Sequence, residues 1–226
     1  MKYRVRIDVS ILFFVIIFTG VLYRMPQLYI GGVNANHLLD FLGVIVILLG
    51  TYLRMSARGY KKENSDKGKS LVVEGPYTLV RNPMYLGTLL IGSGFVLIIW
   101  PWWSLPVFVG IFYARFRRQI IKEETYLKEL FTKTFEDYCS RVPRLFPTIK
   151  TLRKAQWGEI FISQSAWTTK EKWGLIGWPV LAVFFEVLQN NIVFGFRDTQ
   201  RTIFIFVLGI IVFAIMAYKL NQLKSK

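Results

Sequence analysis

Two clusters of polar residues interrupt a chain that is otherwise rich in apolar segments. The first, Glu74–Gly87, leads directly into an apolar segment. The second begins with Glu123 and Glu124 and continues to Arg141–Arg144, just after the next apolar segment. We expect both clusters to lie at the same face of a membrane and to form one site, which is where the chemistry of the protein should be found.

The first cluster carries turn and helix-start signals. Gly75-Pro76 indicates a turn, and Pro83 suits the first turn of a helix, where its missing N–H needs no partner. Asn82 then stands at the N-cap, where its side-chain oxygen can accept a backbone N–H. A helix N-terminus attracts carboxylates and phosphates, and the rings of Tyr77 and Tyr85 offer flat faces to a purine or a cation. A basic, aromatic loop that anchors the protein at the lipid interface explains the same residues equally well.

The second cluster places a carboxylate on an apolar helix face. The apolar residues of this face recur at helical spacing: Phe116, Ile120, Leu127 and Leu130. Glu123 falls on the same stripe, where a carboxylate is costly unless a cation meets it. Glu123 therefore either binds a ligand or forms an ion pair with Arg118 or Arg144.

The neighbouring charges have ordinary alternatives as well. Glu124 points away from the stripe and can pair with Lys128 one helical turn later. Arg141 and Arg144 either hold an anionic group or belong to a general excess of basic residues on one membrane face.

Apolar helices must position these clusters. Hydrophobic residues make up 53% of 226 positions, and the mean hydropathy is +0.38. The apolar blocks approach the roughly 20 residues that cross a bilayer. We predict membrane spans at Val9–Tyr29, Leu38–Ala57, Met84–Trp100, Trp102–Phe116, Gly174–Phe194 and Thr202–Lys219. The third and fourth form a short hairpin, so the predicted fold is an all-α polytopic integral membrane protein of about six spans with a cofactor pocket at its cytoplasmic face.

The net charge of +15 follows the positive-inside pattern. Basic residues concentrate before the first span, between spans two and three and between spans four and five, whereas the opposite loops hold Arg24, Arg197 and Arg201. We therefore predict that both termini are cytoplasmic and that the protein lies in the inner or plasma membrane. Anionic lipid head groups explain the charge without nucleic acid as a partner. No small-residue cleavage site follows the first apolar block, which favours a retained span over a signal peptide.

Metal and histidine chemistry are not expected. Cys139 is the only cysteine, so the chain has neither an internal disulfide nor a cysteine cluster for a metal. The only histidine, His37, is predicted on the membrane face opposite both polar clusters. We therefore predict no metal cofactor.

Taken together, the motifs resemble the isoprenylcysteine carboxyl methyltransferase and phospholipid methyltransferase superfamily. The matching residues are, in order, Gly75-Pro76-Tyr77, Arg81-Asn82-Pro83-Met84-Tyr85-Leu86-Gly87, Glu123-Glu124, Phe135-x-x-Tyr138 and Val142-Pro143-Arg144. The resemblance covers roughly Leu38 to Pro147. It implies a membrane-embedded enzyme that binds S-adenosylmethionine at the cytoplasmic face and admits a lipophilic substrate from the bilayer.

The resemblance also implies a set of site residues. The cofactor-binding residues carried over by position are Lys69, Ser70, Leu71, Val72, Gly75, Tyr77, Arg81, Asn82, Pro83, Met84, Tyr85, Glu123 and Glu124. The family usually has His where this chain has Asn82, whose amide cannot titrate near neutral pH. The substrate-side Arg of the family would map near Gln119, so that Arg118 or Arg115 would take its role.

Methyl transfer from a sulfonium requires alignment of the reacting atoms and exclusion of water. A carboxylate acceptor is already ionised at neutral pH and needs a cation to steer it rather than a general base. Arg118 and Arg144 are the catalytic candidates for that cation, and Glu123 would neutralise the positive end of the cofactor. Spans three and four would form the wall that admits an apolar tail.

The remaining sequence is less specific. Residues 1–150 are predicted to form the methyltransferase core, and residues 151–226 an interfacial segment followed by two further spans. The glycines of span three are expected to permit close helix packing: Gly87, Gly92 and Gly94.

Two other functions stay open at this point. An NADPH-dependent membrane lipid or steroid-type reductase shares an Arg-x-Pro-x-Tyr block, and a non-catalytic membrane protein could keep the same fold. Neither the methyl acceptor, nor whether O, N or S is methylated, nor the oligomeric state is encoded in a pattern that we can interpret.

Overall fold

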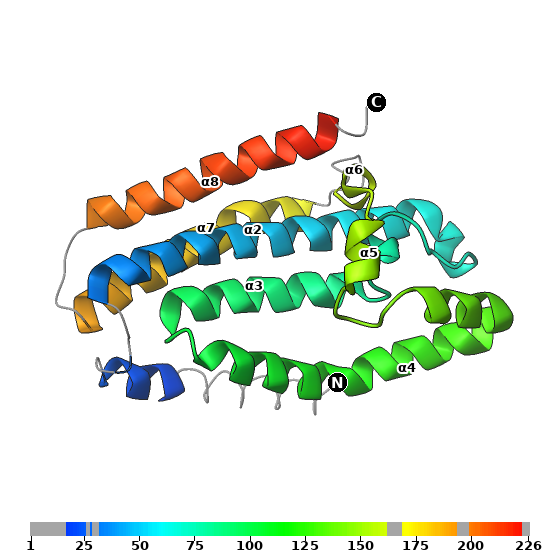
Figure 1. The fold of residues 1–226 in the computed structure, drawn as a ribbon, viewed down its shortest axis with the longest axis horizontal. Coiled ribbons are helices and arrows are strands. Elements are labelled where there is room, and N and C mark those ends of the chain that lie inside the picture. The colour runs from blue at the N-terminus through cyan, green and yellow to red at the C-terminus, as the bar shows by residue number, and fades with distance from the viewer. Residues whose placement is uncertain (1–16, 26–27, 29–31, 162–168, 194–198, 223–226) are drawn as a thin grey trace.

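The computed structural model describes residues 17–25, 28, 32–161, 169–193 and 199–222. Over these ranges the regular secondary structure is helical, without a strand. This confirms the all-α prediction. The five long helices are α2 (Gly32–Asn64), α3 (Pro83–Ile99), α4 (Ser104–Arg141), α7 (Thr169–Val193) and α8 (Thr199–Gln222). Figure 1 shows α3 between α2 and α4, and both α7 and α8 pack against α2.

Short helical elements connect these long helices. They are η2 (Asp66–Gly68) and η3 (Gly75–Thr78) between α2 and α3, and α5 (Ile149–Arg153) and α6 (Trp157–Ile160) after α4. The end of α6 is tied to α2 because the hydroxyl of Ser56 donates to the carbonyl of Ile160 at 2.5 Å. The ring of Tyr52 also stacks on that of Phe161, with centroids 5.4 Å apart. Part of the predicted interfacial segment therefore packs on the helix core. The division at residue 150 stays a prediction.

Glycines bring α2 and α3 into backbone contact. A Cβ on Gly50 would lie 2.6 Å from the carbonyl oxygen of Gly87, and a Cβ on Gly87 would lie 2.6 Å from the carbonyl oxygen of Gly50. One heptad away on both helices, Gly43 and Gly94 face each other in the same way. Small residues at this spacing let two antiparallel helices approach more closely than larger side chains permit. The predicted packing role of Gly87 and Gly94 is confirmed.

The predicted hairpin joins α3 and α4 through Trp100–Trp103. A Cβ at the third glycine, Gly92, would collide with the ring of Phe108 on α4, so this glycine also serves packing. The fourth apolar block was predicted to end at Phe116 and a helix to continue from it past Glu123, and α4 does continue, to Arg141. The helix therefore extends well beyond its apolar part and carries the second polar cluster with it.

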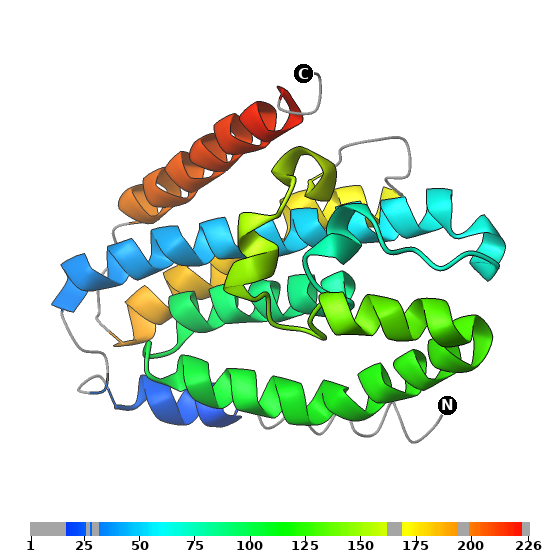
Figure 2. The ribbon, with the colours of Figure 1, turned by 45° about the vertical axis from the view of Figure 1, so that its right-hand side comes forward.

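A kink divides α4 into two arms. Thr132 has φ 36° and ψ −108°, a conformation that is rare for a β-branched residue. Figure 2 shows the chain turning back after this point, so that the second arm lies beside the first. Across the corner, Lys128 Nζ lies 2.9 Å from Glu136 Oε1. This fold-back brings residues 133–141 next to η3 and the start of α3.

The described helices differ in how well they fit a membrane. Leu38–Asn64 is the one described helical segment that is long and apolar enough to cross a bilayer, while Pro83–Ile99, Gly174–Gln189 and Thr202–Met216 are apolar but shorter. Helices α7 and α8 leave large apolar side chains exposed, including Phe184 and Phe204, which suits contact with lipid. The number of spans and the side on which the termini lie remain predictions, and most of the predicted first span lies outside the described residues.

Candidate functional site

The first polar cluster is built by η3 and the start of α3. Gly75 has a φ of 58°, which favours glycine, and a Cβ there would lie 2.8 Å from the ring of Tyr60. The turn buries Tyr77, whose hydroxyl donates to the carbonyl of Ala57 at 3.3 Å. The carbonyl of Tyr77 accepts a hydrogen bond from the hydroxyl of Tyr138 at 2.7 Å. The turn is therefore tied to α2 on one side and to the second arm of α4 on the other.

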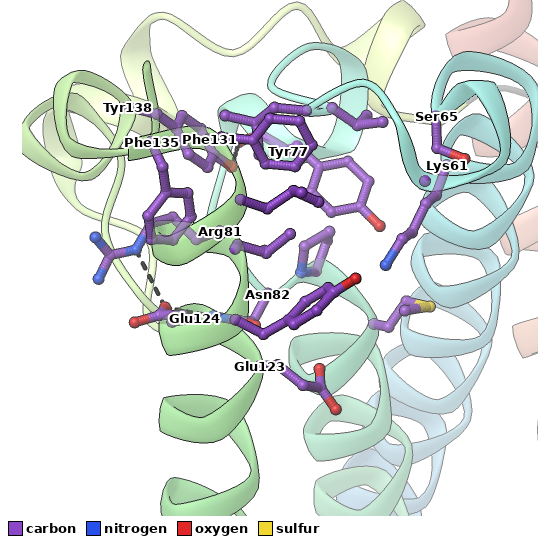
Figure 3. A pocket seen from close by; sticks show the side chains of 18 of the residues that line it. Lys61, Ser65, Tyr77, Arg81, Asn82, Glu123, Glu124, Phe131, Phe135 and Tyr138 are labelled. Carbon is purple, nitrogen blue, oxygen red and sulfur yellow. Dashed lines mark hydrogen bonds and ion pairs between the residues drawn. The ribbon is translucent and has the colours of Figure 1, made fainter. Parts of the chain in front are cut away.

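Glu124 is the centre of a buried charge cluster. It is 7% exposed, and its carboxylate lies 3.3 Å from Arg81 Nε and 2.9 Å from Arg144 Nε. The amide of Asn82 donates to Glu124 Oε1 at 2.9 Å and to the carbonyl of Arg144 at 3.0 Å. Figure 3 shows Arg81, Asn82 and Glu124 gathered at one side of the site. Two guanidinium groups and one amide thus compensate a carboxylate that would be costly to bury alone.

Glu123 has a different environment from its neighbour. Its Oε1 accepts one hydrogen bond from the hydroxyl of Tyr85 and another from the amide of Gln119, both at 2.8 Å. Within the described chain these donors are neutral, and Glu123 pairs with neither Arg118, which is exposed, nor Arg144, which pairs with Glu124. Its negative charge therefore remains available to a ligand.

Two further expectations are wrong. Glu124 does not pair with Lys128, because the kink in α4 brings Glu136 to that lysine while Glu124 faces the buried arginines. Asn82 does occupy the N-cap position of α3, but its side chain makes no capping hydrogen bond. The amide is instead engaged as a donor by Glu124, a stronger, charged acceptor.

A cavity of about 430 Å³ lies between the two clusters. Figure 3 shows the rings of Tyr77, Phe131, Phe135 and Tyr138 at one end of it and Glu123 at the other. It is lined by eleven of the predicted cofactor residues: Ser70, Leu71, Val72, Tyr77, Arg81, Asn82, Pro83, Met84, Tyr85, Glu123 and Glu124. The chain therefore brings both polar clusters to one concave site, whose size is within the usual range for small-molecule pockets.

The other predicted site residues lie outside this lining. Lys69 is exposed, and Gly75 is buried under the ring of Tyr60. Arg118 is exposed on α4, and Arg144 pairs with Glu124 without lining the cavity itself. The binding and catalytic roles assigned to these four residues remain predictions.

Other lining residues escaped the sequence-based assignment of the site. Lys61 lies in the last turn of α2 and Ser65 directly follows that helix, while Phe131, Phe135 and Tyr138 flank the kink. The extension of α2 past its apolar part gave no pattern that points to a site. Phe135 and Tyr138 belong to the motif, but nothing in their spacing indicates that the chain folds back.

The two buried tyrosines are neutral hydrogen-bonding groups. Burial raises the pKa of Tyr77 and of Tyr138 far above the ordinary value for a phenol. Their hydroxyls therefore stay protonated at physiological pH and serve as fixed donors within the wall of the cavity.

Metal ligands do not gather in the described part of the chain, where no three His, Cys, Asp or Glu side chains form a group. The side chain of His37 lies outside the described residues. The prediction of no metal cofactor accordingly stays a prediction.

Comparison with known proteins bears on what this cavity does. Residues 38–134, which include η3, the start of α3 and both glutamates, match the phospholipid methyltransferase family. This stretch of the chain is similar to that methyltransferase family. The match confirms the resemblance that the motifs indicated.

Individual relatives point to the same superfamily. The chain is 28% identical over 135 residues to protein-S-isoprenylcysteine O-methyltransferase B of Arabidopsis thaliana, an alignment that covers 56% of this chain and 68% of that protein. It is 28% identical over 134 residues to protein-S-isoprenylcysteine O-methyltransferase of Schizosaccharomyces pombe, covering 56% of each. The Saccharomyces cerevisiae enzyme of that name is 30% identical over 116 residues, covering 48% of each. No solved structure matches the chain significantly.

These matches link the cavity to methyl transfer. The two yeast proteins are spanned by this chain over about half of their length. Methyltransferases need a methyl donor, and the similarity to this family together with one long apolar helix in the described part of the chain indicates association with a membrane.

Proposed function

We propose that the protein is a membrane methyltransferase that binds S-adenosylmethionine in the cavity and methylates a carboxylate at the end of a prenyl or similar lipid chain. The observation that supports this most directly is the convergence of both polar clusters on one cavity of about 430 Å³. The carboxylate of Glu123, whose hydrogen-bond donors in the described chain are neutral, lines this cavity. The relatives named as O-methyltransferases support the choice of acceptor chemistry.

The cavity lining suits this methyl donor. The donor carries positive charge on its ammonium and sulfonium groups, and Glu123 offers a carboxylate whose described partners are the neutral groups of Tyr85 and Gln119. Its adenine is flat and aromatic, and the rings of Tyr77 and Phe135 lie in the same cavity. Size, charge and aromatic surface therefore all agree with an adenosyl ligand that ends in an amino acid.

The neighbouring residues hold this arrangement in place. The ion pairs of Glu124 with Arg81 and Arg144 fix the start of α3 against α4. The hydrogen bond from Tyr138 to Tyr77 fixes the second arm of α4 over η3. We infer that these contacts preorganise the cavity, so that little ordering is left for the bound state.

The chemistry needs no general base. When bound, the donor supplies a methyl group on a positively charged sulfur. An acceptor carboxylate oxygen forms the new bond to the methyl carbon, and the electron pair of the breaking carbon–sulfur bond stays on sulfur. No proton moves, so the absence of a titrating side chain at Asn82 does not impede esterification. The protein's tasks are to align the two groups and to keep water out.

Binding measurements with purified protein in detergent test this proposal. We expect S-adenosylmethionine to bind with micromolar affinity and NADPH not to bind, as measured by isothermal titration calorimetry. Glu123→Gln should weaken binding by about tenfold or more, because it removes a charge and keeps the shape. Glu129→Gln, an exposed glutamate on the same arm of α4, is the matched control and should leave the affinity unchanged.

Turnover completes the test. Transfer of a radiolabelled methyl group to N-acetyl-S-farnesylcysteine would support the proposed acceptor class. NADPH binding in place of S-adenosylmethionine would assign the protein to the reductases. If neither cofactor binds, the fold serves a non-catalytic role and the proposal fails.

A further inference from the structure

A second cavity adjoins the proposed cofactor pocket. It has a volume of about 590 Å³ and is lined by Arg54, Arg58, Lys61, Lys62, Ser65, Met84, Tyr85, Thr88, Phe116 and Glu123. Five of these residues also line the first cavity: Lys61, Ser65, Met84, Tyr85 and Glu123. The two cavities therefore share a boundary, and the carboxylate of Glu123 stands on it.

The second cavity is strongly basic on its α2 side. Arg54 and Arg58 are one helical turn apart, and Lys61 and Lys62 follow on the next turn, so these cations line up along one side of the helix. Glu123 is the one carboxylate among the lining residues, and it also lines the first cavity. The site is thus built to attract an anion at a position beside the proposed methyl donor.

The remaining lining suits an apolar group and a fixed cation. Met84, Tyr85 and Phe116 supply apolar surface, and the rings of Tyr85 and Phe116 pack with centroids 5.6 Å apart. Arg54 is held in place because its Nη1 donates to the hydroxyl of Thr88 on α3. A positioned guanidinium can bind a carboxylate through two parallel hydrogen bonds, which fixes its orientation as well as its charge.

Charge separates the two cavities into a donor side and an acceptor side. Glu123 favours the positive groups of a bound methyl donor in the first cavity, whereas Arg54 and Arg58, which line only the second of the two cavities, favour a negative group there. One helical turn before Glu123 on α4, the neutral side chain of Gln119 already donates to Glu123. Among the residues that line the second cavity α4 contributes no cation, whereas α2 contributes four: Arg54, Arg58, Lys61 and Lys62.

We propose that Arg54 and Arg58 bind the anionic group of the methyl acceptor, a carboxylate at the end of an apolar tail, and place it beside the methyl donor. This inference rests on the proposed function and adds the residues that select the acceptor. It assigns the steering cation to α2, in place of Arg118 or Arg144 on the α4 side. The same cations can also attract the phosphate of a lipid head group, and the experiment separates these two sources of negative charge.

Steady-state methylation of N-acetyl-S-farnesylcysteine in Arg54→Gln and Arg58→Gln variants tests the proposal. We expect each variant to lower kcat/KM for this acceptor by about 10- to 100-fold, mainly through KM, because a charge-assisted hydrogen bond is lost. The affinity for S-adenosylmethionine should stay within about twofold of the unsubstituted protein. Arg117→Gln, at an exposed arginine of α4 outside both cavities, is the matched control and should change neither quantity.

Two further measurements make the outcome decisive. The methyl ester of N-acetyl-S-farnesylcysteine, which has lost the carboxylate charge, should inhibit the variants and the unsubstituted protein equally. Arg58→Lys should recover part of the lost kcat/KM, since it restores the charge without the planar fork. Because Arg54 also bonds Thr88, calorimetric binding of S-adenosylmethionine serves as the check that the Arg54 variant is folded.

Distinct results would overturn the two proposals. If S-adenosylmethionine does not bind to the unsubstituted protein, the proposed function fails. If it binds and turnover occurs, but neither arginine variant changes KM for the carboxylate acceptor, the acceptor site is elsewhere. Weaker binding of both variants to phosphatidylserine vesicles, with KM unchanged, would identify the basic side of α2 as a lipid head-group contact instead.

Discussion

The amide nitrogen of Asn82 lies 2.9 Å from Oε1 of Glu124, a distance that makes Asn82 part of the buried charge cluster rather than a helix cap. The same nitrogen donates to the carbonyl of Arg144 at 3.0 Å. One amide therefore joins the start of α3, the first arm of α4 and the segment that follows α4. This use of Asn82 as a donor needs no titration, which explains how the chain can do without the histidine that the resemblance led us to expect.

Asn82→Asp should destabilise the protein by about 2–4 kcal/mol, because it removes a donor and places a second carboxylate beside Glu124. Thermal unfolding in detergent at neutral pH measures this loss. Asn191→Asp is the control, since the exposed Asn191 donates only within α7, and it should cost far less. Equal unfolding temperatures for the two variants would show that the contact between Asn82 and Glu124 contributes nothing to stability.

The close contact between Gly50 and Gly87 predicts that alanine substitutions at Gly87 and at Gly110 change the stability of the protein in opposite directions. Gly87→Ala should destabilise the protein by about 1–3 kcal/mol, because the new methyl would lie 2.6 Å from a backbone oxygen that cannot move aside. Gly110→Ala, on α4, meets nothing within 4 Å and should instead stabilise the helix by up to about 1 kcal/mol. Unfolding temperatures of both variants decide the matter, and a stabilising Gly87→Ala would contradict the close approach of α2 and α3.

Local signals predicted the elements that position the site. The apolar blocks predicted α2, α3, α7 and α8, Pro83 predicted the start of α3, and the short link at Trp100–Trp103 predicted the hairpin. These features depend on hydrophobic burial and on residues with restricted backbones, and both can be read along a single segment. The meeting of the two polar clusters at one site followed from that order of elements.

Contacts between distant residues were harder to predict. The residue at the kink is Thr132, which adopts a positive φ, and no glycine or proline stands there to indicate a break in the helix. That kink determines that Lys128 meets Glu136 and that Tyr138 covers the cavity. Likewise, helical spacing placed Glu123 on the apolar stripe of α4. Only the tertiary fold brings Arg81 and Arg144 to Glu124 and makes Glu124 the more deeply buried of the two glutamates.

Tyr138 gives a prediction about alkaline pH. Its hydroxyl donates to the carbonyl of Tyr77, so Tyr138→Phe should cost about 1 kcal/mol near neutral pH. Burial raises the pKa of Tyr138 in the folded protein above the value of about 10 that it has when unfolded. The unfolded state therefore ionises first, and the contribution of Tyr138 to stability, complete below about pH 10, is lost as the pH rises further.

Denaturant unfolding at a series of pH values checks this. The stability difference between the unsubstituted protein and Tyr138→Phe should be largest between about pH 7 and 9 and should shrink above about pH 10. Tyr126→Phe, at a residue that is 63% exposed, should show no such narrowing. A difference that stays constant up to the alkaline unfolding limit would mean that Tyr138 ionises as readily in the folded protein as in the unfolded one.

Cys139, the only cysteine of the chain, should react slowly with alkylating reagents. Burial raises the pKa of its thiol, an effect that the nearby Arg81 guanidinium opposes only in part. Since the thiolate is the reactive form, a raised pKa lowers the reactive fraction at pH 8 and shifts the rate profile to more alkaline pH. Mass spectrometry after timed exposure to iodoacetamide, from pH 7 to 10, measures this profile without interference from other thiols. N-acetylcysteine methyl ester under the same conditions is the reference. If the alkylation rate of Cys139 rises at the same pH as that of the reference thiol, or at a lower pH, Arg81 outweighs burial.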